Sequence, residues 1–459
     1  MPRFATLFFH FVVFFSPVAH AADWKAGAAR VNITPKELMW MSGYGARDKP
    51  AEGKLTDLWA KALVLEDGDG QRAVLISLDL VGIDRETSNA VRDELKKQHG
   101  LERRQIAICC SHTHTGPVLG TNLRSMYFLN VAQQKQVRDY TAQLRRDIVT
   151  VVGQAVKDVG PARLSWGVGH STIAVNRRTN KEADVPKLRE TGMLKGPVDH
   201  EVPVLRVAGA DGKLRAVAFG YACHATVLPF YEWSGDYPGF AQIELEKKYP
   251  GAVVLFWAGC GGDQNPLPRR KVELAQEYGR RLAEEAQDVL GGLQRPVEGN
   301  LATAYEEVEL RFAELPSEEQ LETAVTSTNR YEATRAKLLL ERIKREGKLP
   351  ASYPYPVQVW RLGSELRWVL LGGEVVVDYS LRIKRELEAG TTWVAGYTND
   401  VMAYIPSRRV LAEGGYEGGG AMVYYGQPAV WSPEVEETIM RAVHKQLEAA
   451  GRGSDKVTR

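Results

Sequence analysis

The sequence predicts a layered α/β fold, in which mixed β-sheets are flanked by helices within one large domain. Short continuous apolar runs, which are typical of buried strands, alternate with longer segments that carry apolar residues at helical spacing. Alternation of this kind is typical of α/β layered domains. The 459 residues contain no proline- or serine-rich linker and no internal repeat, which favours a single domain over several.

The expected strands and helices follow each other in a regular order. The run 73–79 is a buried strand, and Asp84 is a suitable N-cap for a helix that continues to about residue 99. The other strands are expected at 105–110, 202–207, 216–223, 252–257, 358–362, 367–371 and 393–397. The other helices are expected at 131–158, 240–248, 272–290 and 374–387.

One stretch departs from this alternation, between residues 316 and 349. It is rich in Glu, Lys and Arg, and its apolar residues, such as Leu339 and Ile343, recur at helical spacing. We interpret it as a helical insertion on the surface of a catalytic domain that covers residues 22–450. The polar residues 451–459 are expected to form a disordered tail.

The N-terminus carries the pattern of a secretory signal peptide in residues 1–21. Arg3 supplies the positive charge, a mostly apolar run extends to Val18, and Ala19-His20-Ala21 is a small-x-small cleavage site. The apolar run is shorter than the roughly 20 residues that a membrane-spanning helix needs. We therefore expect cleavage after Ala21, no remaining transmembrane anchor, and a secreted or periplasmic protein.

The composition argues against several classes of protein. The 59 Lys and Arg residues nearly balance the 57 Asp and Glu residues, and the resulting net charge of +2 argues against a nucleic-acid partner. A hydrophobic share of 44% is that of a globular chain rather than a disordered one. Four cysteines are too few for a disulfide-built scaffold. We expect them as buried free thiols, although a single bridge among them stays open.

Polar residues gather where several predicted strands end. His112 and His114 follow one strand, His224 follows a second, and Glu374 follows a third after two glycines. A fourth strand leads into the glycine-rich run 259–262. Because ligand sites in α/β sheets collect at the carboxyl ends of strands, we expect these residues to lie close together.

These residue types point to a metal site. His112 and His114 are two residues apart, which in an extended chain places both imidazoles on one face. Two or three histidines with a carboxylate such as Glu374 are typical of catalytic zinc, which activates water and polarises carbonyl groups. Taken singly, a histidine at a strand end is often structural, and the run 259–262 is either a tight turn or a phosphate cradle. The convergence of four strand ends favours a metal-dependent hydrolase.

Several segments resemble the neutral, non-lysosomal ceramidase family, and the most specific is Ser111-His112-Thr113-His114-Thr115-Gly116-Pro117. The resemblance extends over nearly all of the chain after the signal peptide, from about residue 27 to residue 426. The other matching segments are Gly27-Ala28-Ala29-Arg30-Val31-Asn32-Ile33-Thr34-Pro35, Met41-Ser42-Gly43-Tyr44-Gly45, Leu58-Trp59-Ala60-Lys61-Ala62, Asn176-Arg177, His224, Glu374, Asn399, Tyr404, Tyr416-Glu417 and Tyr425-Gly426.

This resemblance implies a secreted, zinc-dependent enzyme of lipid metabolism that uses a metal-bound water to cleave the amide bond of an N-acyl or lipid substrate. His114 would serve as a proton shuttle or as a group that supports the ligands. Arg177 and Tyr425 would steady the oxyanion, which suits their donor groups. The implied ligands of Zn²⁺ are His112, His224, Glu374 and Tyr404.

Three features depart from the family pattern, and one of them is the helical stretch 316–349, which is expected to reshape the pocket. Asn265, in Gly262-Asp263-Gln264-Asn265-Pro266, stands where the family has its active-site serine. An amide is no nucleophile, but it can hydrogen-bond a substrate carbonyl or carboxylate, so a metal-water mechanism survives the change. About 33 residues follow Gly426, fewer than the roughly 100 of the C-terminal immunoglobulin-like domain that the family carries.

Three functions therefore remain open. The first is a ceramidase-like zinc amidohydrolase, which His112, His224 and Glu374 favour. The second is a metal-dependent hydrolase of an ester, or of an amide on a sugar or peptide, which Asn265 favours. The third is a non-catalytic binding protein on the same fold.

Overall fold

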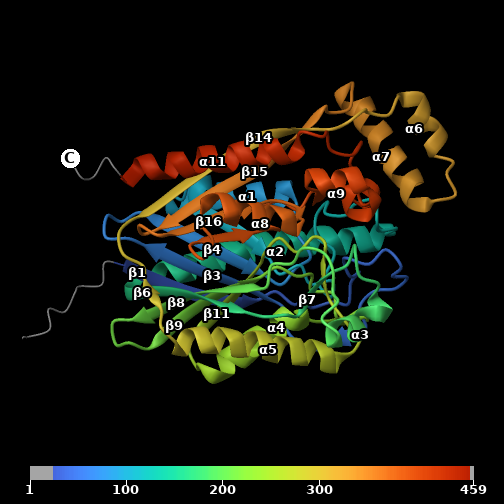
Figure 1. The fold of residues 1–459 in the computed structure, drawn as a ribbon. Coiled ribbons are helices and arrows are strands. Elements are labelled where there is room, and N and C mark those ends of the chain that lie inside the picture. The colour runs from blue at the N-terminus through green and yellow to red at the C-terminus, as the bar shows by residue number, and fades with distance from the viewer. Residues whose placement is uncertain (1–23, 455–459) are drawn as a thin grey trace, which may run out of the picture.

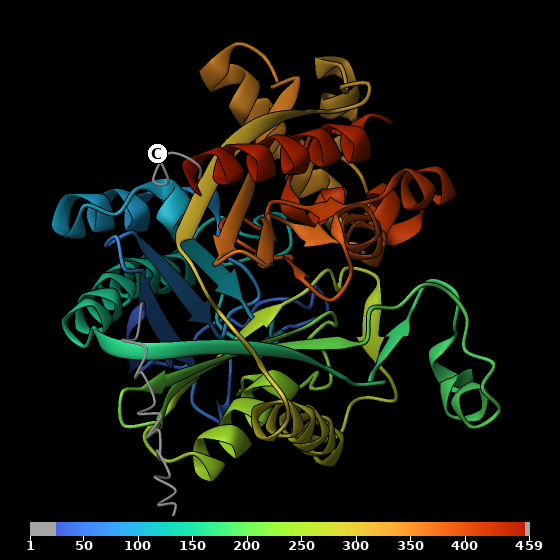
Figure 2. The same cartoon turned by 60° about the vertical axis from the view of Figure 1, so that its left-hand side comes forward.

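The structure, a computed structural model, describes residues 24–454. Within that range two mixed β-sheets pack face to face, and helices cover both outer sides (Figure 1, Figure 2). The predicted layered α/β fold is confirmed. The signal peptide expected at residues 1–21 lies outside the described residues.

The larger sheet has the strand order β11-β9-β8-β6-β1-β3-β4-β5, with β13 paired to β6. β11 runs parallel to β9 and β4 runs parallel to β5, whereas the other neighbours are antiparallel. Its strands are β1 (Trp24–Asn32), β3 (Trp59–Glu66), β4 (Arg72–Leu78), β5 (Ile106–Cys110), β6 (Gly160–His170), β8 (Glu201–Gly209), β9 (Leu214–Tyr221), β11 (Val253–Ala258) and β13 (Arg295–Pro296).

The smaller sheet has the order β14-β15-β16-β18, in which only β16 and β18 run parallel. Its strands are β14 (Leu301–Arg311), β15 (Ser352–Leu362), β16 (Leu366–Leu371) and β18 (Thr392–Ala395). Three short strand pairs complete the ladders: β2 (Gly53–Lys54) with β10 (Glu232–Trp233), β7 (Ala174–Asn176) with β12 (Gln264–Pro266), and β17 (Glu374–Val375) with β19 (Tyr404–Ile405).

The helices form two outer layers. α1, α2, α4 and α5 pack against the larger sheet, and α8 and α11 pack against the smaller one. The helices are α1 (Arg85–His99), α2 (Val131–Lys157), α3 (Val185–Glu190), α4 (Asp236–Lys248), α5 (Val272–Gly291), α6 (Glu318–Ala324), α7 (Arg330–Glu346), α8 (Val377–Leu387), α9 (Arg408–Glu413), α10 (Met422–Tyr425) and α11 (Val435–Ser454). In residues 24–454 no helix combines the length and the apolar character that crossing a lipid bilayer requires.

The alternation of side chains along each strand produces the layers. In β3, Ala62 and Val64 face the core under the helices, while Leu63 and Leu65 face the second sheet. Between the sheets, aromatic pairs have ring centroids 5.2 to 6.3 Å apart. These rings belong to the buried tryptophans Trp166, Trp257, Trp360, Trp368 and Trp393.

The same alternation separates Cys109 and Cys110, which belong to different core clusters on the two faces of β5. All four cysteines are buried and free, as expected. The single disulfide bridge that stayed open as a possibility is not formed among them.

Several local expectations are confirmed. Asp84 is the N-cap of α1 and accepts a hydrogen bond from the backbone N–H of Thr87. Two helices, α6 and α7, occupy the stretch expected to be a helical insertion. The disordered tail expected at 451–459 does not begin at residue 451, because the last helix continues to Ser454. Residues 455–459 lie outside the described residues.

The expected helix at 374–387 is wrong at its start. Glu374 and Val375 form the short strand β17, and α8 begins only at Val377. The backbone N–H of Glu374 donates to Ala403 O, and the N–H of Val377 donates to the carboxylate of Asp263. These long-range partners hold Glu374 in an extended conformation, which local helical spacing cannot reveal.

The twist of the larger sheet positions the site. β5 and β9 lie near opposite ends of the strand order and point in opposite senses along the sheet. Each step between strands rotates the direction by roughly 20–25°, so six steps turn the two strands by on the order of 130°. Their carboxyl ends therefore meet on one side of the molecule, where Thr113 and Ala225 form a parallel bridge.

Candidate metal centre and active site

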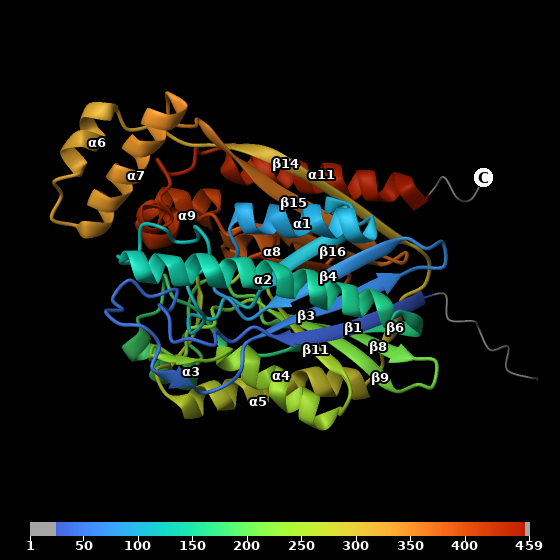
Figure 3. The same ribbon diagram turned by 180° about the vertical axis from the view of Figure 1, so that it is seen from behind.

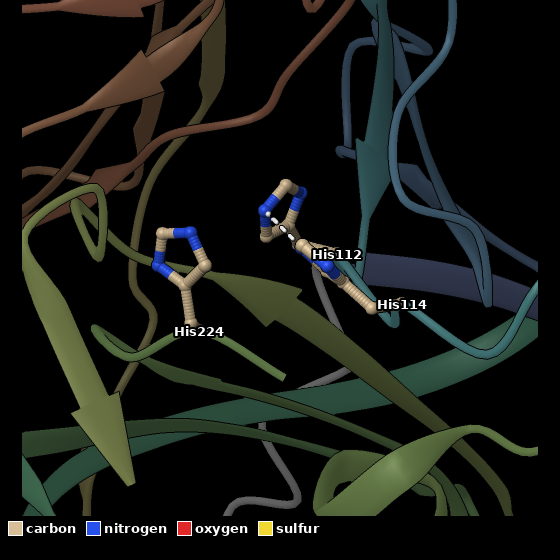
Figure 4. Close-up of side chains that lie close together, drawn as sticks. All are labelled: His112, His114 and His224. Atoms are coloured by element: carbon tan, nitrogen blue, oxygen red, sulfur yellow. Dashed lines mark hydrogen bonds between the residues drawn. The ribbon is translucent and has the colours of Figure 1, made fainter. Parts of the chain in front are cut away.

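Two buried histidines form the base of the site. His112 lies just beyond β5 and His224 just beyond β9, and each has 1% of its surface exposed. Figure 4 shows both imidazoles beside that of His114. His112 has a φ of 62°, a left-handed conformation that non-glycine residues adopt rarely and that is concentrated at functional sites.

Backbone carbonyls fix the tautomer of both histidines. Nδ1 of His112 lies 2.5 Å from Val81 O, and Nδ1 of His224 lies 2.7 Å from Gly261 O. A carbonyl oxygen only accepts, so each Nδ1 carries the proton and donates it. In the neutral imidazole each Nε2 then presents a lone pair, which is how a metal-ligating histidine is usually oriented.

Glu374 brings a carboxylate between these two lone pairs. Its Oε2 lies 3.1 Å from Nε2 of His112 and 3.1 Å from Nε2 of His224. With both Nδ1 atoms protonated, neither Nε2 can donate to it, and Oε2 has no hydrogen-bond donor. Its other oxygen, Oε1, accepts a hydrogen bond from the hydroxyl of Tyr425.

Tyr404 enters the site through the short β17–β19 ladder. Glu374 and Tyr404 are paired residues in this parallel ladder, so the two side chains are positioned by the same backbone bonds. The Tyr404 hydroxyl lies 3.1 Å from Nε2 of His224, and it accepts a hydrogen bond of 3.0 Å from Arg177.

This arrangement fits a metal ion. Ligands about 2.0–2.1 Å from a tetrahedral ion lie roughly 3.3 Å from one another, close to the 3.1 Å separations found here. Three buried acceptors facing each other without a donor would repel, and a cation between them removes that cost. The nitrogens of His112, His114 and His224 also lie within 4.8 Å of one another, so His114 is a further potential ligand.

His114 is more accessible than the other two histidines. Its Nε2 lies 3.1 Å from Nε2 of His112, and its Nδ1 has no hydrogen-bond partner. Its ring packs against Tyr44, with centroids 4.8 Å apart. His114 therefore adds a third imidazole beside His112 and His224, with a buried Nδ1 that no hydrogen bond occupies.

Arg177 organises the part of the site around Tyr404 and Asn265. Its Nε donates to Glu417 at 2.7 Å, and its two terminal nitrogens donate to Asn265 Oδ1 at 3.2 Å and to Tyr404 at 3.0 Å. Glu417 is also bonded to Arg178, which holds it in place. The guanidinium is thus fixed in orientation beside the histidines.

The glycine-rich run 259–262 lets two chain segments approach each other. A Cβ on Gly261 would lie 2.8 Å from the backbone of Cys223, and one on Gly262 would lie 2.7 Å from Glu374 O. Glycine is required here for close backbone contact, and not for a positive φ, which neither residue has. This contact brings His224 and Glu374 together.

The electrostatic setting maintains the charges that metal binding requires. Burial alone would raise the pKa of Glu374, but His112 and His224 hold that pKa well below its usual range. Burial, together with the charge of Arg177, lowers the pKa of His224 to about 4, so that this imidazole is neutral near pH 7. Burial and the charge of Glu374 raise the pKa of the Tyr404 hydroxyl.

The structure brings all eight candidate residues into one connected cluster. The contacts above join His112, His114, His224, Glu374, Tyr404, Tyr425, Arg177 and Asn265.

Sequence reasoning missed two participants. Glu417 binds Arg177, and the buried ring of Tyr397 packs 4.3 Å from that of His112. Glu417 lies within a segment already noted for its resemblance, but nothing local marks Tyr397.

Comparison with known proteins identifies relatives of this chain. Residues 24–256 match the family described as neutral/alkaline non-lysosomal ceramidase, N-terminal. The neutral ceramidase of Pseudomonas aeruginosa is 24% identical over 87% of this chain and 69% of its own length. The neutral ceramidase of Drosophila melanogaster is 25% identical over 54% of this chain, and neutral ceramidase B of Dictyostelium discoideum is 27% identical over 46%. These two alignments span 36% and 31% of the relatives' own lengths.

The fold is shared as well. The crystal structure of the Pseudomonas aeruginosa neutral ceramidase superimposes with a TM-score of 0.72 at 21% identity, covering 93% of this chain and 74% of that one. A second ceramidase structure, complexed with C2, superimposes with a TM-score of 0.71. The family match spans half of the sequence and includes His112, His114 and His224. This chain therefore belongs to the neutral/alkaline non-lysosomal ceramidase family.

Proposed function

We propose that this protein is a zinc-dependent hydrolase that cleaves the amide bond of an N-acyl or lipid substrate. The observation that carries the proposal is the convergence of two oriented imidazoles on the unpaired carboxylate oxygen of Glu374. We assign the metal to His112, His224, Glu374 and Tyr404. Membership of the ceramidase family supports the choice of an amide.

When bound, Zn²⁺ supplies a Lewis acid that polarises a carbonyl oxygen and lowers the pKa of water. The protein's part is to keep the ligands in place and in the right protonation state. The carbonyls of Val81 and Gly261 hold the two histidine rings, and Tyr425 holds Glu374. Outer contacts of this kind typically contribute 10- to 100-fold in metal affinity or activity.

We assign the stabilisation of the charge that develops during amide cleavage to Arg177 and Tyr425. Arg177 can bind the oxyanion, because its bonds to Glu417, Asn265 and Tyr404 leave guanidinium hydrogens unused. The Tyr425 hydroxyl donates its single hydrogen to Glu374, so Tyr425 can serve the oxyanion only when that bond is released. We assign proton transfer to His114, whose imidazole is neutral because burial holds its pKa well below the usual range, and whose Nδ1 has no hydrogen-bond partner. These roles use the chain's own groups and need no serine.

A second candidate is hydrolysis of an ester, or of a sugar or peptide amide. Asn265 favours it, because its amide is fixed by Arg177 at the position where the ceramidases have a serine. An amide side chain can bind a substrate carbonyl or carboxylate that ceramide does not offer in the same place. A non-catalytic binding role is the outcome left if no substrate is cleaved.

A substrate panel separates these functions. Hydrolysis rates are measured for ceramide, N-acyl amino acids, N-acetyl sugars and aryl esters, with wild-type protein and with His112→Ala. We expect amide cleavage that His112→Ala abolishes and that His444→Ala, a change at an exposed histidine remote from the cluster, leaves intact. Esters or sugar amides cleaved in place of N-acyl amides would support the second candidate. Full activity of His112→Ala would overturn both.

We further propose that the protein is secreted or periplasmic. The support is the arrangement of Arg3, the apolar run and Ala19-His20-Ala21. N-terminal sequencing of protein recovered outside the cytoplasm tests this, with Ala22 expected as the first residue. Recovery of full-length chain from the cytoplasm alone would contradict it.

A further inference from the structure

A helical hairpin projects from one corner of the molecule beside the site. It consists of α6 and α7 and connects β14 to β15, whose end residues Arg311 and Ser352 are partners in the antiparallel register. Figure 1 and Figure 3 show the hairpin extending beyond the sheets, close to α9. It has a small core of its own, made of Leu321, Ala336, Leu339 and Leu349. The hairpin is therefore an addition to a strand connection that could be much shorter.

The first turn of α7 attaches the hairpin to the body. The Tyr331 hydroxyl donates to Gly45 O at 2.6 Å, and Arg330 donates to the same oxygen at 3.1 Å. The Tyr331 ring packs against Tyr424, with centroids 5.0 Å apart. The Arg330 guanidinium lies 4.3 Å from the ring centre of Phe128.

Two of the segments that Tyr331 contacts also reach the metal centre. Gly45 follows Tyr44, whose ring packs on His114. Tyr424 precedes Tyr425, which bonds Glu374. Tyr331 therefore bridges the loop at Gly45 and the helix α10, and this places the hairpin at the rim of the site.

Aromatic rings continue from this bridge to the metal ligands. Tyr424 lies 6.1 Å from Tyr416, Tyr416 lies 5.3 Å from Tyr404, and Tyr404 lies 6.2 Å from His224, all between ring centroids. These rings are not fully covered by other residues, because Tyr416 has 43% of its surface exposed. We call Tyr331, Tyr424, Tyr416 and Tyr404 the aromatic row.

We propose that the aromatic row is a wall against which the apolar chain of the substrate lies, and that Tyr331 is its specificity-determining outer residue. This inference rests on the proposed amide hydrolase function. Partly exposed aromatic rings offer a large apolar area at a small cost in side-chain entropy, and they bind hydrocarbon without fixing one position along it. The row leads away from the reacting centre, as the distal part of a linear substrate must.

The position of Arg330 sets the end of this wall. Its guanidinium lies over both Phe128 and Tyr331, so a charged group covers the apolar surface beyond the row. Beyond Tyr331 a substrate chain meets the Arg330 guanidinium over the ring of Phe128, and we expect it to gain little further contact area. The hairpin thus sets the length of the wall, and a protein without the hairpin would offer a shorter wall to the substrate chain.

A series of N-acyl para-nitroanilides, with acyl groups from acetyl to dodecanoyl, tests the inference. For wild type, kcat/KM is expected to rise about two- to fourfold for each added methylene along the row and then to level off. In Tyr331→Ala the rise should end at a shorter chain. Tyr331→Phe keeps the ring and should keep the wild-type profile, and Lys337→Ala, an exposed change on α7, should match wild type throughout.

A second variant covers the case in which Tyr331→Ala does not fold. Replacing residues 315–349 by a short glycine linker joins strand ends that are already paired, and it should shorten the profile in the same way. A profile unchanged in a folded Tyr331→Ala variant or in the hairpin deletion overturns the inference while amide hydrolysis stands. Wild-type protein that cleaves none of the anilides, ceramide or N-acyl amino acids overturns the proposed function, and this inference with it.

Discussion

The metal-centre cluster and the α6–α7 hairpin differ in how the chain holds them. The cluster draws residues from four distant strand ends, nearly all buried and each bonded to backbone or to another site residue. The hairpin is local in sequence, has its own core, and attaches through its first turn. We infer that chemistry depends on the long-range framework, whereas substrate choice depends on an element that can change without disturbing it.

The largest expected effect comes from Glu374→Gln. The change keeps the shape of the side chain but removes the charge that a cation between His112 and His224 requires. We expect activity to fall by on the order of 10³-fold or more, because loss of the metal removes several kcal/mol of transition-state stabilisation. Metal analysis and kcat/KM are measured together. Glu386→Gln, on the surface of α8, is the control, and equal activity in the two variants would contradict the account.

A smaller effect is expected on the donor side of the site. Arg177→Lys keeps the positive charge but cannot serve Glu417, Asn265 and Tyr404 at once. We expect kcat/KM to fall about 10- to 100-fold with metal content unchanged. Arg178→Lys is the matched comparison, since Arg178 bonds Glu417 but not Tyr404. A larger loss for Arg178→Lys than for Arg177→Lys would be inconsistent with a role at the oxyanion.

The sequence indicated much of this framework, for reasons that particular residues make clear. Buried strands such as β4 and β5 are continuous apolar runs, and the histidines follow them directly. The strand β6 was not predicted from the sequence, because its three glycines and its polar positions resemble a loop. Glu374 was placed in a helix because only its distant partner, Ala403, reveals the short ladder.

The candidate site was predictable as a set of residues but not as a geometry. His112, His114, His224 and Glu374 were marked by their positions after strands, whereas Tyr404 came only from the resemblance. The twist that turns β5 and β9 to the same side depends on the whole strand order, which spacing along the chain does not give. The contacts of Tyr331 with Gly45 and Tyr424 likewise depend on the tertiary structure and cannot be predicted from spacing along the chain.

The buried framework also predicts a pH-dependent stability. Burial raises the pKa of Asp400 to about 7, against roughly 3.9 in an unfolded chain, although the Tyr353 hydroxyl bonds its carboxylate at 2.6 Å. The folded state therefore binds more protons between about pH 4 and pH 7, and stability falls as pH rises through that window.

Asp400→Asn cannot ionise and should not show this loss. Relative to wild type, it should gain about 2–4 kcal/mol between pH 4 and pH 8. Urea unfolding of both proteins at the two pH values measures the difference. A constant difference, or one that grows in the opposite direction, would show that Asp400 ionises normally in the folded chain.

The smallest effect is expected from removing the hairpin. Replacing residues 315–349 by a glycine linker keeps Phe312 stacked on Trp431, at 4.8 Å between centroids, and leaves both sheets intact. We expect the thermal midpoint to move by less than about 5 °C and metal content to stay the same, because the hairpin has a separate core. Loss of metal, or of cooperative unfolding, would show that the two regions are not independent.

The metal content of purified protein tests the central claim most directly. Elemental analysis is applied to wild type, His224→Ala and His444→Ala, each confirmed as folded by circular dichroism. The account predicts stoichiometric zinc in wild type and in His444→Ala, whose imidazole pairs with Glu386 at the surface, and little in His224→Ala. Wild-type protein that takes up no stoichiometric divalent metal, or His224→Ala that retains it in full, would contradict the account.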